Sequence, residues 1–311
     1  MESLEEQVLR PLGVLIIEHL LEPLDRGVKF VAPAYHAFLR RPRPNTATVG
    51  GASMGDWFYV YTCGWAVFFT VCFLVIPVVS RRFFPVWWDS LKTTVKGRNG
   101  KDKVIDYRRD FPSYVVCMMH HVVVVPRSWY RIYQDYNLPR SQWATFDYGP
   151  VDYIVAPFLL GYLLSDSICY ALPNLSVEYI LHHTFTIAVT AAGHSSDSYL
   201  SRFIPHLLSS DTTQLFFNGA WLLKRFGWKD DSPLCMLLEI LFVFAFPCVR
   251  IIILPMAFLT VTLNGSAIGF GWVRYMFLPL SLMQYYWFSK IISRLWKIVS
   301  PSPAKPKPHT E

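Results

Sequence analysis

Residues 57–79 form an unbroken apolar run, and this run limits the folds open to the chain more than any other feature. An α-helix rises about 1.5 Å per residue, so a helix of this length crosses a hydrocarbon core of about 30 Å. The first residues, Trp57, Phe58 and Tyr59, are aromatic, as is typical at a membrane interface. The run therefore predicts a transmembrane helix.

The composition indicates that lipid is the solvent for much of the chain. Hydrophobic residues make up 53% of the 311 residues and charged residues only 16%, whereas soluble domains carry about 25% charged residues. The net charge of +7 does not indicate a nucleic-acid partner, because the basic residues cluster between apolar runs, as topology signals do. The six cysteines lie inside apolar runs without a CxxC motif, so we expect buried, reduced thiols.

Further apolar segments predict an all-α, polytopic membrane protein with about seven transmembrane helices. The predicted spans cover about residues 57–79, 111–130, 150–172, 175–192, 200–223, 233–263 and 267–299. We expect four parts, which are an N-terminal lumenal or interfacial segment (1–55), the first span with a basic cytosolic loop (56–110), a membrane domain (111–299) and a disordered cytosolic tail (300–311).

The distribution of lysine and arginine predicts the orientation of the chain. Residues 80–110 carry nine Lys or Arg residues, and the segment after the fifth span and the C-terminal end are also basic. Cytosolic loops carry an excess of such residues, so we expect residues 80–110 and the C-terminus to lie in the cytosol. The six Lys or Arg residues before the first span conflict with this orientation, although part of that region lies far from the span.

Ionisable residues inside the predicted spans are the strongest functional signal. Each costs roughly 2.5 kcal/mol or more in a bilayer, so such residues normally face a bundle interior or a cavity. In the fourth span Glu178, His182 and Thr186 share one helix face, and His183 is next to it. In the fifth span a polar stripe contains Asp211, from which a carboxylate can orient an imidazole. Structural hydrogen bonds between helices are the alternative explanation for both groups.

Two other spans carry polar residues of the same kind. In the second span Ser113, Cys117 and His121 lie on one face, and His120 is adjacent. In the third span Asp166 can pair either with a histidine or with an arginine of the sixth span, in a structural or a catalytic role. We predict no metal site, because the HxxxH and HxxHH spacings of membrane di-iron enzymes do not occur. A transporter would also need a polar interior, but no internal repeat is evident.

Together these motifs resemble the TLC-domain family, which includes ceramide synthases and smaller lipid-homeostasis proteins. The resemblance covers roughly residues 105–295. Its carrying residues are Asp166, the His182-His183-x-x-Thr186 run, the Ser210-Asp211 pair, the pattern of Phe216, Asn218 and Trp221, and His120 and Arg250 with Pro255. Asp211, Ala220 and Leu215 depart from the Glu, Arg and Pro that are usual in the smaller proteins, and the full ceramide synthase motif is absent.

The resemblance implies seven spans, six of which enclose a lipid-accepting cavity, in a protein of the endoplasmic reticulum. It implies a role in lipid metabolism or homeostasis. One hypothesis is an acyltransferase that uses acyl-CoA as co-substrate and a lipid amine or hydroxyl as acceptor. The alternative is a non-catalytic lipid sensor, carrier or trafficking factor. In both cases the partner is a membrane lipid and no cofactor is bound.

For the enzyme hypothesis we predict that His182 or His183 is the base or acyl carrier and that Asp211 orients it. Glu178 is a second candidate for the orienting acid, and Thr186 a hydrogen-bond donor. The residues predicted to bind substrate are Ser113, His120, His121, Asp166, Glu178, Thr186, Gln214, Asn218, Trp221 and Arg250.

Overall fold

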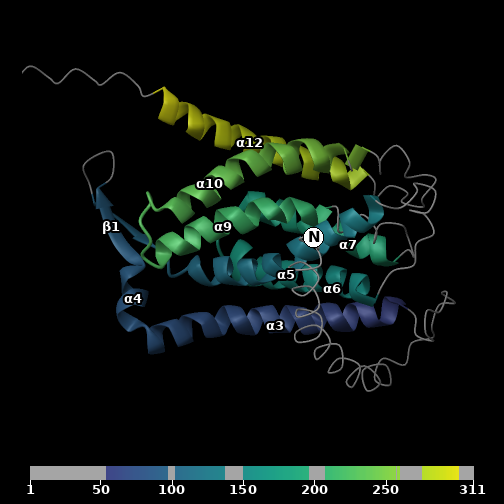
Figure 1. The fold of residues 1–311 in the computed structure, drawn as a ribbon. Coiled ribbons are helices and arrows are strands. Elements are labelled where there is room, and N and C mark those ends of the chain that lie inside the picture. Colours follow the sequence, from purple (N-terminus) through teal and green to yellow (C-terminus); the bar gives the residue numbers. More distant parts are fainter. Residues whose placement is uncertain are drawn as a thin grey trace, which may run out of the picture.

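The structure is a computed structural model that describes residues 54–96, 102–136, 150–195, 207–256, 258–259 and 275–300. Long helices pack side by side along roughly one direction (Figure 1). They are α3 (Met54–Phe83), α5 (Phe111–Tyr136), α6 (Pro150–Asp166), α7 (Val177–Ser195), α9 (Thr212–Arg225), α10 (Pro233–Ala245) and α12 (Phe277–Val299). The prediction of a largely helical protein is therefore confirmed.

Each predicted span coincides with a helix in its described part. Two helical stretches, Tyr61–Phe83 and Pro233–Met256, are long and apolar enough to cross a bilayer, and Val155–Ala171 is a shorter apolar stretch. The fifth span corresponds to a 3-10 turn, η5 (Ser209–Asp211), followed by α9, and its predicted start lies outside the described residues. The N-terminal segment up to residue 53 and the tail after residue 300 also lie outside them.

The basic segment 80–110 is more ordered than the predicted loop. After α3 it forms a short helix, α4 (Pro85–Ser90), and an antiparallel hairpin of β1 (Lys92–Lys96) and β2 (Asp102–Asp106). The hairpin pairs Lys92 with Asp106 across the strands, and opposite charges at such positions are favourable. Consecutive β-branched residues occupy the middle of both KTTVK and DKVID, which favours strands.

This segment docks on the end of α9. The indole N–H of Trp87 donates to the carbonyl oxygen of Arg225 at 2.8 Å, and the Arg225 guanidinium lies 3.7 Å from the ring centroid of Tyr107. At the end of β2, Arg108 donates two hydrogen bonds to Asp106 and thereby holds the pKa of that carboxyl below its ordinary value. The hairpin, α4 and the C-terminal end of α12 lie at one end of the bundle (Figure 1), so the described basic segments gather there.

Apolar side chains cover much of the outside of the bundle. On α3, Val67, Val71, Leu74 and Val78 follow helical spacing and are 51–67% exposed. Such a large apolar surface is unusual for a soluble monomer and suits contact with lipid. All six cysteines are free, as expected, but only Cys235 is buried, and Cys63 and Cys248 are exposed because they lie on such outward faces.

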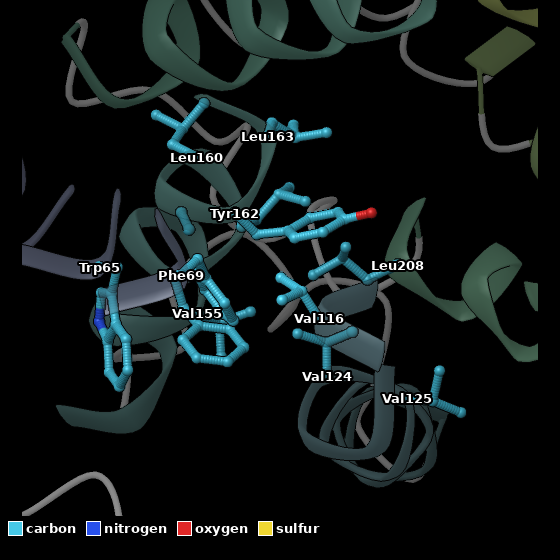
Figure 2. Packing of buried hydrophobic residues seen from close by; sticks show 13 residues of the cluster. Trp65, Phe69, Val116, Val124, Val125, Val155, Leu160, Tyr162, Leu163 and Leu208 are labelled. Carbon is cyan, nitrogen blue, oxygen red and sulfur yellow. The ribbon is translucent and has the colours of Figure 1, made fainter. Parts of the chain in front are cut away.

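The interior is built where α3, α5 and α6 meet. Trp65 and Phe69 of α3 lie in one buried cluster with Val116 of α5 and Tyr162 of α6 (Figure 2), and the ring centroids of Phe69 and Tyr162 are 5.7 Å apart. The aromatic rings are in edge contact, with 4.6 Å between the ring centroids of Trp65 and Phe158. This cluster fixes α6, whose opposite side carries polar residues described below.

Gly161 lets α6 approach α3 closely. A Cβ atom at this position would meet the Cβ of Trp65 and would lie 2.8 Å from the backbone nitrogen of Ala66. Backbone atoms cannot move aside as the end of a flexible side chain can, so the two helices would have to separate.

We therefore predict that Gly161→Ala lowers stability by about 1–3 kcal/mol through overpacking. The matched control is Gly219→Ala on α9, where the new Cβ would meet only the ends of the Leu238 and Met118 side chains, at 3.3 and 3.4 Å. The control should stay within about 1 kcal/mol of the parent, since alanine is the better helix former. Thermal unfolding in detergent measures both variants, and equal melting temperatures would contradict the prediction.

Candidate functional site

A cavity of about 380 Å³ lies inside the bundle among α5, α6, α7, α9, α12 and the π-helix η6 (Phe246–Ile253). Twelve of the thirteen residues predicted to form the site line this cavity. They are Ser113, His120, His121, Asp166, Glu178, His182, His183, Thr186, Asp211, Gln214, Asn218 and Arg250.

Trp221 is the exception, because it is not among the residues that line the cavity. Its ring stacks on Tyr114 with 3.9 Å between centroids, and the Arg225 guanidinium lies 5.2 Å from it. It sits one helical turn from Asn218 on α9, toward the docked hairpin. Trp221 therefore packs α9 against α5 rather than lining the cavity.

One polar group of the cavity joins α5, α6 and α7. The hydroxyl of Ser113 donates to Asp166 at 2.8 Å, and the other carboxylate oxygen of Asp166 lies 3.6 Å from Nε2 of His183. Ser167 Oγ lies 3.1 Å from Nδ1 of His183. Ser113, Asp166 and His183 are all buried. A carboxylate and an imidazole at this distance form an ion pair if the ring is protonated, although the distance exceeds that of a hydrogen bond.

A local change of helix type positions this group. α6 continues directly into the π-helix η4 (Ser167–Ala171), and Asp166 is the residue at the junction. The Ser167 hydroxyl donates to the carbonyl oxygen of Leu163 at 2.6 Å. Wide π-turns inside α-helices are frequent at functional sites, because they shift side chains away from the regular helical register.

A second polar group surrounds Asp211 at the start of α9. Its two carboxylate oxygens lie 3.6 Å from Nε2 of His121 and 3.8 Å from the guanidinium of Arg250. Asp211 is therefore paired with His121 of the second span, whereas the histidine of the fourth span that lies beside a carboxylate is His183. Asp166 takes that position beside His183, because the junction of α6 and η4 places it opposite α7.

Arg250 holds the second group together. It donates to Thr213 at 2.6 Å, to the carbonyl oxygen of Ser210 at 3.2 Å and to Gln284 of α12 at 2.8 Å. Gln284 is 2% exposed and was absent from the prediction. Gln284 could have been found in the same way as the other cavity residues, because it is a polar amide within the seventh apolar span.

Two histidines of the cavity have unpartnered ring nitrogens in the described structure. Both nitrogens of His120 and Nδ1 of His182 are buried without a hydrogen-bond partner. His120 lies between the rings of Phe158 and Tyr162, with centroid distances of 5.3 and 4.4 Å. Thr186 donates to the main-chain carbonyl of His182 at 2.8 Å, so in this structure its hydroxyl does not donate to either imidazole.

The rim of the cavity is charged. Glu178 accepts hydrogen bonds from Lys290 at 2.6 Å and from Tyr286 at 2.8 Å, which links α7 to α12. The Glu178 side chain is 41% exposed, and both of these partners belong to α12. Arg294, one turn beyond Lys290, lines the cavity and is exposed.

Comparison with known families identifies the chain. Residues 110–293 match the family model of the TLC domain, which is more than half of the chain. The chain therefore belongs to the TLC-domain family, as the sequence motifs indicated. No curated protein and no solved structure matches it. Family membership and the two apolar helices together indicate an integral membrane protein with a lipid-related function.

We predict that Arg250→Met destabilises the protein by about 3 kcal/mol or more, because it leaves the buried Asp211, Thr213 and Gln284 without their partner. Adding Asp211→Asn should recover part of this loss, since the amide removes the uncompensated charge. Melting temperatures of the purified single and double variants measure both effects. An Arg250→Met variant as stable as the parent would contradict the role of Arg250 as a buried structural link.

Proposed function

We propose that this chain binds a membrane lipid in the cavity and acts in lipid metabolism or homeostasis in the endoplasmic reticulum. The observation that supports this most directly is the pairing of His183 with Asp166 on the wall of a cavity whose lining also includes apolar residues. Val189, Leu254 and Phe258 contribute to the apolar part. An acyl chain would contact these residues while its polar end lies near the His183–Asp166 pair.

We further propose acyl transfer from acyl-CoA to a lipid amine or hydroxyl as the reaction. In this reaction the nucleophile attacks the thioester carbonyl, a new C–N or C–O bond forms, and the C–S bond breaks. His183 takes the proton of the nucleophile and then gives it to the departing thiolate, so no oxidant or reductant is needed. Asp166 stabilises the imidazolium that exists between these two transfers.

His183 fits the role of base better than His182. Only His183 lies beside a carboxylate, whereas the nearby His182 has an unpartnered Nδ1. His182 suits the role of acyl carrier in a two-step form of the same transfer: its imidazole attacks the thioester and the C–S bond breaks, and the lipid nucleophile then attacks the acyl-imidazole and releases His182. This assignment keeps both histidines of the sequence prediction and replaces Asp211 by Asp166 as the orienting acid.

The charged rim supports a co-substrate that carries phosphate. Lys290 and Arg294 both line the cavity and are exposed, and the first is already paired with Glu178. Arginine binds phosphate well because its planar guanidinium donates two parallel hydrogen bonds. Arg294 is thus placed to contact the phosphates of CoA while the acyl chain enters the cavity.

The alternative, a non-catalytic lipid sensor, carrier or trafficking factor, needs the cavity but not the histidine–carboxylate pair. The apolar walls favour it to the same extent as the enzyme, since they serve lipid binding in both cases. The two functions differ in what the pair does, so variants of the pair separate them.

We predict that His183→Ala and Asp166→Asn lower acyl transfer about 100-fold, the size typical of losing a general base. The control is Ser165→Ala, adjacent in sequence, whose hydroxyl accepts a hydrogen bond from Thr70 of α3. Lipidomics of deletion cells that express each variant, together with native mass spectrometry for bound lipid, measures activity and binding separately. If His183→Ala restores the lipid profile and still binds lipid, the chain is a sensor or carrier and not an acyltransferase.

We propose that the long helices α3, α5, α6, α7, α9, α10 and α12 cross the membrane, with the hairpin end and the C-terminus in the cytosol. The basic segments gather at this end of the bundle, which agrees with the excess of positive charge on cytosolic loops. A C-terminal epitope should therefore be digested by protease added to sealed microsomes. Protection of the epitope would contradict this orientation.

A further inference from the structure

The second polar group of the cavity contains an arrangement that the proposed function does not use. His120 and His121 of α5 and Asp211 at the start of α9 each direct one ligand atom to a common space, and these atoms lie within 4.8 Å of one another. The first two side chains are fully or almost fully buried, and Asp211 is mostly buried. Two imidazole nitrogens and a carboxylate oxygen form a donor set that suits Zn²⁺.

The state of the His120 ring indicates that this group binds an ion and is not only a structural cluster. Its ring is 0% exposed, and neither nitrogen has a hydrogen-bond partner among the described residues. Buried polar groups are almost always satisfied by protein, water or an ion, so an imidazole with two free nitrogens requires a partner. The rings of Phe158 and Tyr162 hold it in place, and His121 is its neighbour with 5.1 Å between ring centroids.

The surroundings supply the outer contacts that metal ligands usually have. Nδ1 of His121 lies 3.4 Å from Sγ of Cys117, which leaves its Nε2 directed toward Asp211. Arg250 lies beside Oδ1 of Asp211, and Oδ2 is the oxygen that faces His121. Such contacts orient ligands and hold a carboxylate in place.

We propose that His120, His121 and Asp211 bind a Zn²⁺ ion, with a fourth coordination position open to the cavity. Three protein ligands and one open position are the arrangement of zinc sites that contact substrate. The positive charge of Arg250 beside the site favours an anionic fourth ligand, such as hydroxide or a lipid carboxylate or phosphate oxygen. The proposal is independent of acyl transfer, since it uses neither His183 nor Asp166.

The ligands were not recognisable from sequence spacing. Helical metal sites usually take side chains one turn apart, as in HxxxH, whereas here two adjacent histidines and a residue 90 positions further on converge. Asp211 reaches the site because η5 and α9 pack against α5.

The test is the zinc content of the full-length protein, purified in detergent with a tag that contains no histidine and equilibrated with Zn²⁺ before removal of the excess. Elemental analysis should give about one zinc per chain for the parent, as for a dedicated site. His120→Ala and His121→Ala should lose at least about nine tenths of it, because a site of three ligands does not survive with two. The control variants, His182→Ala and His183→Ala, remove imidazoles of the same cavity and should retain the zinc of the parent.

Replacement by Co²⁺ gives a second readout, since a tetrahedral site with nitrogen and oxygen ligands produces a visible absorption that should vanish in His120→Ala. Melting temperatures show which variants are folded. The Asp211→Glu variant tests the third ligand without removing its charge, because it keeps a carboxylate beside Arg250. The proposal is overturned if the folded parent retains no zinc, if His120→Ala retains it, or if the control variants lose it equally. None of these outcomes depends on lipid transfer, so they leave the proposed function to its own test.

Discussion

The guanidinium of Arg250 is the contact on which the polar interior depends. Arg250 belongs to η6. Its guanidinium donates to Thr213 and to the carbonyl oxygen of Ser210 near the start of α9, and also to Gln284 on α12. In an apolar interior a cation is tolerated only with partners of this kind, so the three segments must stay in register. The cavity therefore exists between helices that are held by polar bonds as well as by packing.

Two carboxylates divide the cavity into chemically different regions. Asp166 has a serine hydroxyl and a histidine as neighbours, and no arginine lies beside it in the described structure. Asp211 has a histidine and Arg250, so a positive charge is always close to it. The first carboxylate therefore lies beside groups without a permanent charge, whereas the second lies beside a permanent cation.

The sequence was sufficient to predict the helical class, the approximate positions of the long helices and twelve of the residues that line the cavity. This worked because ionisable residues such as Asp166 and Arg250 are so costly in lipid that their presence alone predicts an interior position. The pairing of these residues was not predictable in the same way. It depends on the π-turn after Asp166 and on the packing of α9 against α5, which single-helix periodicity does not contain. The hairpin was missed because residues 80–110 were interpreted through their charge rather than through the β-branched residues at 93–95 and 104–105.

Because α3 approaches α6 closely at Gly161, α3 packs in the same core as the helices of the matched segment. The TLC match begins at residue 110, after α3 has ended at Phe83. Yet Trp65 and Phe69 of α3 fill the core against α5 and α6, and the ring of Phe69 lies 6.4 Å from that of His120. Cutting the chain at the family boundary would expose this core and remove a wall behind one of the cavity histidines. In this protein the packed core is therefore larger than the segment that matches the family, and it includes α3.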